Sequence, residues 1–308
     1  MLDIVNINPR QLRIPGAIMV GLWTLAVLWH GPVLERLFLV YIGLFIGVGI
    51  GSYIALPDLK RPSARRLIML LMGSLLLLVA LLSDHGNMQI EGLFFGILAG
   101  GAPYIILHFA LAKIAGPLLF GRIWCGWACW FGMVFDLLPY PYSRYRLPGR
   151  WGWLRYAHFL ITLGIVLLVW YGLGQQGALG SVGLAWFITG LLLYYGVGIA
   201  LAVALKDNRA FCKYLCPLAV LLKTGSRFSL VKIGGTPTSC DACQACVEMC
   251  PMNIRVRDYI LSGQRVLSTE CTLCQTCINV CPDNTLKLTI GFDIGGQELL
   301  DHQPPKAR

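Results

Sequence analysis

Long apolar stretches separated by short polar connections fill the first two thirds of the chain. About 20 apolar residues in a helix cross a hydrocarbon core of about 30 Å, and six stretches reach or approach that length. They cover residues 12–30, 34–56, 66–83, 93–115, 155–173 and 184–205. This pattern predicts an all-α transmembrane helix bundle of about six spans.

The connections between the apolar stretches alternate in charge. Those at residues 57–66 and 116–155 are basic, whereas the connections after the third and fifth stretches carry no Lys or Arg. Cytoplasmic loops of membrane proteins carry an excess of Lys and Arg. We therefore expect both termini in the cytoplasm and the chain in a bacterial-type inner membrane. The first apolar stretch is not followed by a small-residue cleavage site, so we expect it to be retained as a span.

The composition supports a lipid environment. Hydrophobic residues make up 56% and charged residues 13% of the 308 residues, whereas soluble domains carry about 25% charged residues. A net charge of +10 is compatible with nucleic-acid binding. The basic residues lie in loops, however, and they form no basic face interleaved with aromatic residues. We expect membrane lipid, and no nucleic acid, as a partner.

Cysteines are concentrated near the C-terminus, where eight of the twelve fall within residues 240–281. A run of the form C-x2-C-x2-C-x3-C-P begins at Cys240 and recurs at Cys271. In this run three closely spaced thiolates hold one [4Fe–4S] cluster, and the fourth Cys ligates the other cluster. The proline breaks the backbone after the fourth Cys. The alternative is a pair of four-cysteine zinc sites, which typically use C-x2-C units on separate knuckles.

The crossed pattern predicts two ligand sets, one for each cluster. They are Cys240, Cys243, Cys246 and Cys281, and Cys271, Cys274, Cys277 and Cys250. The run resembles that of two-cluster bacterial-type ferredoxins, which implies a small α+β domain and low-potential, one-electron transfer. We expect a transmembrane domain at 1–234, this ferredoxin domain on the cytoplasmic side at 235–292, and a flexible tail at 293–308.

Four further cysteines lie beyond the ends of predicted spans. Cys125 and Cys129 form one C-x3-C pair, and Cys212 and Cys216 form another. Each pair has an Arg three residues before its first Cys and an aromatic residue directly before it. Positions i and i+4 share one face of a helix, so we expect the four thiols to converge if the two pairs meet. Three interpretations are open: a third metal centre such as an iron–sulfur cluster, redox-active dithiols, or inert buried cysteines.

The order of these motifs resembles the NapH/MauN/NosR group of membrane polyferredoxins over roughly residues 93–292. The best-known members are membrane quinol dehydrogenase components of nitrate-reductase systems. Trp130 stands where the group usually has Pro after the first pair, whereas Pro217 follows the second pair as in the group. Six spans are also more than the four of the simplest members. The resemblance implies electron transfer between a membrane quinone and the clusters, as an electron-transfer subunit of an oxidoreductase system.

Few side chains within the predicted spans can exchange protons. His108 lies in the fourth stretch and His158 early in the fifth. An ionisable group inside a span is a functional candidate, and these two histidines are the candidates for a quinone or proton site. A His near a helix end can instead bond a backbone carbonyl.

A second class of function shares these features. The protein could donate electrons for the reduction of copper or iron, in metal uptake or in cofactor maturation, and related polyferredoxins are linked to such work. Its redox partners would then belong to a metal-handling system instead of a respiratory one. A regulatory iron–sulfur sensor is disfavoured because no DNA-binding or signalling segment is recognisable in the sequence.

Overall fold

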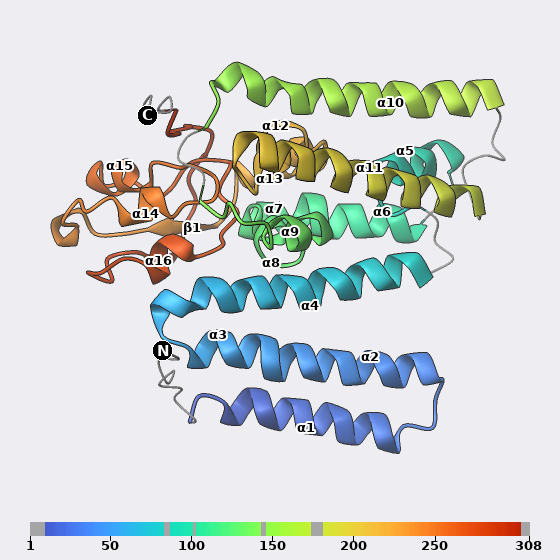
Figure 1. The fold of residues 1–308 in the computed structure, drawn as a ribbon, viewed down its shortest axis with the longest axis horizontal. Helices are drawn as coiled ribbons and strands as arrows, with labels where there is room; N and C mark the ends of the chain where they lie inside the picture. The colour runs from blue at the N-terminus through green and yellow to red at the C-terminus, as the bar shows by residue number, and fades with distance from the viewer. Residues whose placement is uncertain (1–9, 83–86, 101–102, 143–145, 174–180, 303–308) are drawn as a thin grey trace.

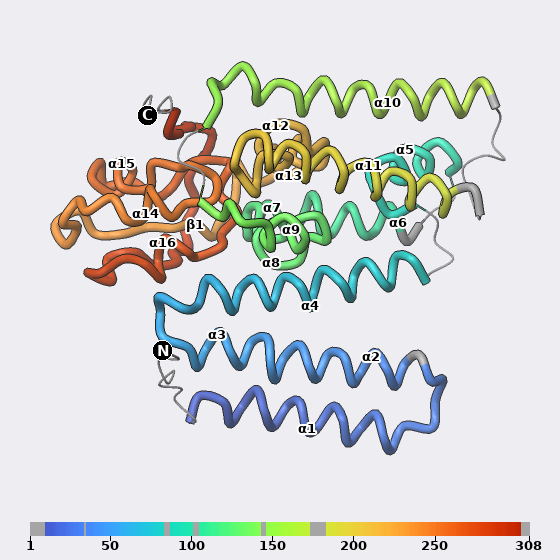
Figure 2. Tube along the Cα trace, in the orientation of Figure 1, coloured from blue at the N-terminus to red at the C-terminus, as the bar shows by residue number. Residues whose placement is uncertain are grey.

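Helices lie side by side along most of the chain, and a small loop-rich domain covers one end of them (Figure 1). The computed structural model describes residues 10–82, 87–100, 103–142, 146–173 and 181–302. The tube in Figure 2 follows the long helices as they run back and forth along the longest axis of the molecule. This arrangement confirms the mostly helical fold with a small appended domain.

The first part of the chain forms the outer helices of the bundle. They are α1 (Arg13–Leu28), α2 (Val33–Leu44), the π-helical η1 (Phe45–Ile50), α3 (Gly51–Ala55), η2 (Asp58–Lys60) and α4 (Arg61–Leu82). The middle of the chain follows with mostly short helices. They are α5 (Ile90–Ala99), α6 (Pro103–Phe109), η3 (Ala110–Ala115), α7 (Gly116–Phe120), α8 (Ile123–Trp127) and α9 (Trp130–Phe135).

Two long helices lead to the small domain. After η4 (Gly149–Trp153) come α10 (Leu154–Leu173), α11 (Ser181–Leu205), α12 (Ala210–Tyr214) and α13 (Leu218–Ser226). The small domain itself has short elements. They are β1 (Val231–Gly234), η6 (Pro237–Ser239), α14 (Ala245–Glu248), α15 (Val256–Leu261), α16 (Thr276–Asn279) and β2 (Lys287–Ile290).

Four helical segments of the described residues are long and apolar enough to cross a membrane. They are Glu35–Ala55, Asp58–Leu82, Gly149–Gly172 and Gly183–Leu205. A fifth is present if Ile105–Phe120 and Ile123–Phe135, which meet at a bend of 98°, count as one broken span. The first predicted stretch forms α1, whose 16 residues fall short of a full span. The expectation of about six spans is therefore not confirmed: the described residues contain four such helices, or five with the bent pair.

The fourth predicted stretch, 93–115, is not one continuous helix. Its first part belongs to α5, which ends at Gly100 with a φ of 61°, the left-handed conformation that glycine adopts at helix ends. A new helix, α6, then begins at Pro103, a residue favoured in the first turn because its missing N–H needs no partner there. Local breaking signals thus override the continuous apolar pattern.

A cluster of aromatic side chains forms the core where α9, α11 and α12 meet. Phe131 lies with its ring centroid 5.5 Å from that of Tyr194 and 6.0 Å from that of Phe211. Phe135 and Phe187 are fully buried in the same cluster. Aromatic pairs at these separations add to the stability gained from burial alone. The core fixes α12, and therefore the second C-x3-C pair, against α9.

A buried ion-pair cluster ties three helices together at the same end of the bundle. Asp136, directly after α9, accepts hydrogen bonds from Arg65 of α4 at 2.8 Å and from Arg209, before α12, at 2.6 Å. Burial raises the pKa of Asp136, but Arg209 and Arg65 outweigh it and lower that pKa to about 2. The carboxylate is charged at neutral pH, so both contacts are ionic.

The small domain extends beyond both of its predicted ends. Strand β1 lies before residue 235 and pairs antiparallel with β2, with Val231 opposite Ile290. Residues 293–302, which the sequence assigned to a flexible tail, pack on the domain in the described structure. Asp293 forms an ion pair with Arg265 at 2.6 Å, and Leu300 forms a β-bridge with Ile254. These contacts hold a segment whose composition alone suggests mobility.

The buried ion-pair cluster gives a stability prediction. Asp136→Ala leaves two buried guanidinium groups without their carboxylate, so we expect it to lower the free energy of unfolding by about 3–5 kcal/mol. Thermal or denaturant unfolding in detergent measures this. Asp58→Ala is the control, because its ion pair with Arg61 is solvent-exposed and should contribute less than about 1 kcal/mol. Equal losses in both variants would contradict the structural role of Asp136.

Candidate metal centres

Four of the eight C-terminal cysteines line one buried cavity. They are Cys250, Cys271, Cys274 and Cys277, and the other walls are apolar side chains such as Ile233, Met252 and Val266. The other four cysteines line a second cavity. They are Cys240, Cys243, Cys246 and Cys281. The structure thus brings the eight cysteines together in the two groups that the crossed pattern predicts.

The backbone of the two runs turns in the same way around each cavity. Residues directly before and after the second Cys of each run have positive φ: Ala242 at 60° and Gln244 at 67° in the first, Leu273 at 48° and Gln275 at 60° in the second. Left-handed residues other than glycine are uncommon and are kept where the fold requires them. Here they curl each run so that its thiols face one cavity.

The thiols surround a space and do not meet at one point. In the described ranges, no group of three or more His, Cys, Asp or Glu side chains is placed to share a single metal ion. A [4Fe–4S] cluster is a cube whose four iron atoms each take one thiolate. Four thiols lining a cavity of largely apolar walls, with the fourth supplied by the other run, therefore fit this group.

The two cavities differ in their access to solvent. Cys274 and Cys277 of the first cavity are buried, whereas Cys243 of the second is exposed. Charged residues Asp241, Arg257 and Asp283 also line the second cavity. Thr272 and Leu273, which line the first cavity, contact α8 of the helix bundle. We refer to the first and second cavities below as the inner and outer cavities.

The second C-x3-C pair lies beside the first in the aromatic core. Cys212 and Cys216 are buried there, half-buried Cys129 packs against the same cluster, and Cys216 is within electrostatic range of Cys125 as well. The expected common helix face within each pair is not found. Helix α8 ends at Trp127 before the second Cys of its pair, and α12 likewise ends before Cys216. The four cysteines are brought together by packing of short helices instead.

Buried cations surround these four membrane-edge cysteines. The Nη1 of Arg209 lies 3.9 Å from Cys212 Sγ, and Lys113 is fully buried within electrostatic range of Cys125 and Cys129. Arg122 is 1% exposed and acts on Cys125 as well. Buried charges are costly unless an opposite charge compensates them. This environment suits a group that carries negative charge, such as several thiolates on a metal centre.

Burial also affects the free thiols of the second pair. It raises the pKa of Cys212 to about 11, although Arg209 opposes the rise. Burial raises the pKa of Cys216 further. Reactive dithiols normally have lowered pKa values, because the thiolate is the nucleophile. The surroundings are therefore not those of a typical redox-active dithiol.

The first C-x3-C pair touches the loop that carries the inner-cavity cysteines. A Cβ added to Gly126, in α8, would lie 2.3 Å from the carbonyl oxygen of Thr272. Trp127 Nε1 donates a hydrogen bond to the Leu273 carbonyl at 2.8 Å. Only a residue without a side chain allows this backbone approach. The membrane-edge cysteines and the inner cavity are thus joined by direct backbone contact.

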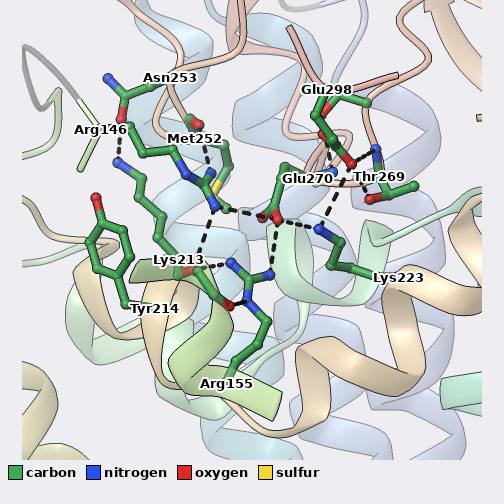
Figure 3. A network of polar contacts seen from close by, with 12 residues as sticks. Arg146, Arg155, Lys213, Tyr214, Lys223, Met252, Asn253, Thr269, Glu270 and Glu298 are labelled. Atoms are coloured by element: carbon green, nitrogen blue, oxygen red, sulfur yellow. Dashed lines mark hydrogen bonds and ion pairs between the residues drawn. The ribbon is translucent and has the colours of Figure 1, made fainter. Parts of the chain in front are cut away.

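Glu270, directly before the inner-cavity loop, is held by four cations. Its carboxylate pairs with Arg122 and Arg155 at 2.9 Å, with Arg146 at 3.3 Å and with Lys223 at 2.6 Å. Figure 3 shows three of these side chains converging on it. Burial raises the pKa of Glu270, but the cations outweigh it and hold that pKa well below the usual range.

The role of these arginines was not predicted from the sequence. Arg122, Arg146 and Arg155 are in the basic connection that indicated membrane orientation, and Arg122 also belongs to the repeated C-x3-C context. A pattern of charge along the chain does not reveal which carboxylate a loop will meet. The sequence does contain one signal that Glu270 needs cationic partners. Glu270 directly precedes Cys271, and a carboxylate without such partners would repel an anionic cluster there.

The two candidate histidines have different surroundings. His158 Nδ1 lies 2.7 Å from the carbonyl oxygen of Leu215, the residue before Cys216, and the ring lines a cavity between α10 and α11. His108 stacks edge-on against Trp124 with centroids 5.9 Å apart. His108 is not part of the wall of that cavity. Of the two, His158 is the one that a small molecule in this cavity could reach.

Comparison with protein families agrees with the positions of the cysteines. A model of a 4Fe-4S binding domain matches residues 102–148 and 189–235, each of which contains one C-x3-C pair. A model of a 4Fe-4S dicluster domain matches residues 238–286, which contain both four-cysteine runs. The chain therefore carries iron–sulfur-binding domains in both its helical and its C-terminal part.

Several known proteins share the same region. The methylamine utilization ferredoxin-type protein MauN of Paracoccus denitrificans is 26% identical over 184 residues, 51% of this chain and 62% of that protein. YccM of Escherichia coli is 27% identical over 195 residues, 56% of this chain and 55% of that protein. The regulatory protein NosR of Pseudomonas aeruginosa is 28% identical over 168 residues, 48% of this chain and 22% of that protein. No solved structure matches the chain.

These matches confirm the resemblance to MauN/NosR-type polyferredoxins. The chain spans less than two thirds of the length of MauN and of YccM. The shared part is the region that holds the C-x3-C pairs and the double cysteine run.

The backbone contact at Gly126 gives a second prediction. Gly126→Ala forces the Thr272 carbonyl away from α8, so we expect the free energy of unfolding to fall by about 1–3 kcal/mol. Amide hydrogen exchange should accelerate at residues 271–275. Gly149→Ala is the control, because no atom lies within 4 Å of the Cβ position there. Unchanged exchange in the Gly126 variant would mean that the loop does not dock on α8.

Proposed function

Because the chain resembles MauN/NosR-type polyferredoxins, we propose that it is a membrane-bound iron–sulfur protein that exchanges electrons with the quinone pool. The observation that carries the proposal is the contact between Gly126 and Thr272, which joins the membrane-edge cysteines to the inner cavity. Electron transfer needs redox centres in close succession. Here the cysteines that would hold them run from the helix bundle to the exposed outer cavity.

The eight C-terminal cysteines act as the ligands of two [4Fe–4S] clusters. The inner cluster is held by Cys250, Cys271, Cys274 and Cys277, and the outer cluster by Cys240, Cys243, Cys246 and Cys281. Each cluster accepts and donates one electron when bound. The residues of the chain set its surroundings: apolar walls keep water from the inner cluster, and exposure at Cys243 lets a partner approach the outer one.

The membrane-edge cysteines hold a third metal centre, which we propose to be an iron–sulfur cluster. The proposal is supported by three observations: the burial of Cys212 and Cys216 beside the first pair, the cations Lys113 and Arg209 around them, and the 4Fe-4S family matches to both segments. Its position between the helix bundle and the inner cavity makes it the link between a quinone and the ferredoxin domain.

The ferredoxin domain lies on the cytoplasmic side of a bacterial-type inner membrane. The basic connections that flank it support this orientation, since cytoplasmic loops carry the excess of Lys and Arg. A redox partner protein docks near Cys243, where the outer cavity is exposed. Both chain termini are then cytoplasmic.

Iron analysis tests the three centres. Anaerobically purified protein should contain about 12 iron atoms per chain if all three are [4Fe–4S] clusters, and about 8 if only the ferredoxin clusters are present. Cys216→Ala should remove about 4 iron atoms and leave the paramagnetic resonance signals of the ferredoxin clusters intact. About 8 iron atoms in both proteins would overturn the third iron centre, and zinc with no acid-labile sulfide would overturn all three.

Reduction by quinol tests the function itself. Menadiol added to membrane vesicles should reduce the clusters, as seen by paramagnetic resonance, because the centres form one route. Cys274→Ala removes a ligand of the inner cluster and should slow reduction of the outer cluster at least about 100-fold, the scale of losing one positioned group. All twelve cysteines belong to the proposed centres, so no Cys→Ala variant can serve as a control. Asp58→Ala, which removes a surface ion pair away from the route, is the control instead. Clusters that stay oxidised in the wild type would contradict quinone exchange.

A further inference from the structure

A cavity of about 570 Å³ lies between α10, α11 and the start of α5. Its walls are mostly apolar, with side chains such as Ile161, Trp186 and Leu193. Three ionisable side chains also face it, Glu91, His158 and Tyr194, together with the hydroxyls of Thr162 and Thr189. Ligand sites are typically of this size and combine apolar walls with a few convergent polar groups.

The three ionisable side chains are arranged as a connected set. Tyr194 Oη donates a hydrogen bond to Glu91 Oε1 at 2.5 Å, and the rings of Tyr194 and His158 are 5.4 Å apart, edge to face. Glu91 Oε2 is buried and has no hydrogen-bond partner among the described residues. A carboxyl group between apolar helices is costly to retain, which marks it as functional.

The tautomer of His158 follows from its partner. A backbone carbonyl only accepts hydrogen bonds, so the Nδ1 of His158 carries the proton that it shares with Leu215 at 2.7 Å. Its Nε2 is then left as an acceptor. The cavity thus offers two proton acceptors, His158 Nε2 and the free oxygen of Glu91, and the phenol hydroxyl of Tyr194 beside them.

The cavity lies against the membrane-edge cysteines. Leu215, the partner of His158, directly precedes Cys216. On the other side, the ring of Tyr194 lies 5.6 Å from that of Phe211, which directly precedes Cys212. His158 and Tyr194 therefore each contact a residue that directly precedes a cysteine of the second pair.

A larger cavity elsewhere in the bundle lacks these features. It has about 890 Å³ and lies among α1, α2 and α4. Its polar groups are already paired within the protein: Trp29 Nε1 donates to Glu35 at 3.0 Å, and Tyr41 Oη donates to the Leu71 carbonyl at 2.7 Å. Such a cavity suits a lipid chain and offers nothing to a reacting head group.

We propose that the cavity lined by Glu91, His158 and Tyr194 binds the head group of an isoprenoid quinol, and this rests on the proposed function. On oxidation both O–H bonds of the quinol break. One proton passes to His158 Nε2 and the other to the Glu91 carboxylate, while Tyr194 positions that carboxylate. The two electrons leave singly for iron–sulfur clusters, each of which is reduced by one electron. Quinone reduction is the same step reversed.

Binding of a quinol analogue tests the site without any electron transfer. The probe is 2-heptyl-4-hydroxyquinoline N-oxide, whose fluorescence is quenched when purified full-length protein in detergent binds it. Glu91→Gln and His158→Gln should each raise its Kd about tenfold or more, the scale of one lost hydrogen bond to a buried partner. Tyr194→Phe should weaken binding less, because it acts through Glu91.

Each variant has a matched control outside the cavity wall. Glu35→Gln changes the same chemistry in the larger cavity, His108→Gln removes the other candidate histidine, and Tyr195→Phe removes a hydroxyl that bonds the Trp130 carbonyl at 2.9 Å. These should keep the wild-type Kd within about twofold, and thermal melting shows which variants are folded. Equal effects of the cavity and control variants would overturn the site.

A photoreactive azidoquinone maps the site in the wild type, so misfolded variants cannot obscure the answer. After illumination, mass spectrometry should find the label on peptides of α10 or α11. Label on α2 or α4 only, in the larger cavity, would overturn the proposal. Failure of the proposed function gives a different result. If the protein binds the analogue at this cavity but menadiol does not reduce its clusters, the binding site stands and the electron route is contradicted.

Discussion

The burial of Glu270 among four cations is the interaction on which the rest of the structure depends. It fixes the start of the inner-cavity loop against basic side chains from three separate segments: Arg122 before α8, Arg146 and Arg155 around η4, and Lys223 in α13. A buried charge that loses its partners is strongly destabilising. The ferredoxin domain is therefore attached to the bundle in one orientation, and Gly126 lets the two backbones meet there.

This attachment sets the order in which the three proposed metal centres follow one another from the helix bundle to the outer cavity. Cys212 and Cys216 are buried near cations, three of the four thiols of the inner cavity are buried, and those of the outer cavity reach solvent at Cys243. A quinol in the cavity at His158 would lie at one end of this series. In the proposed route, protons would be exchanged there on side chains of the bundle, and electrons would continue through the iron–sulfur centres. The separation of the two routes follows from where the ionisable and the thiol groups are placed.

Local patterns in the sequence predicted the parts that depend on spacing. The double cysteine run gave the two groups of four thiols, and apolar length gave most of the long helices. The prediction for 93–115 was wrong as a single helix, because Gly100 and Pro103 break a stretch that is apolar throughout. Contacts between distant residues could not be read from spacing: Glu91 meets Tyr194 across 103 positions, and Arg122 meets Glu270 across 148. The packed segment at 293–302 likewise depends on partners far along the chain.

The most direct test is anomalous scattering at the iron edge from crystals of anaerobically prepared protein. We expect iron density in the inner cavity, in the outer cavity and among the four membrane-edge cysteines, with the ferredoxin loop seated on α8. Iron in both ferredoxin cavities but none among the four membrane-edge cysteines would contradict the proposed third centre, which connects the helix bundle to the ferredoxin domain. Absence of iron from the inner cavity would contradict the electron route as a whole.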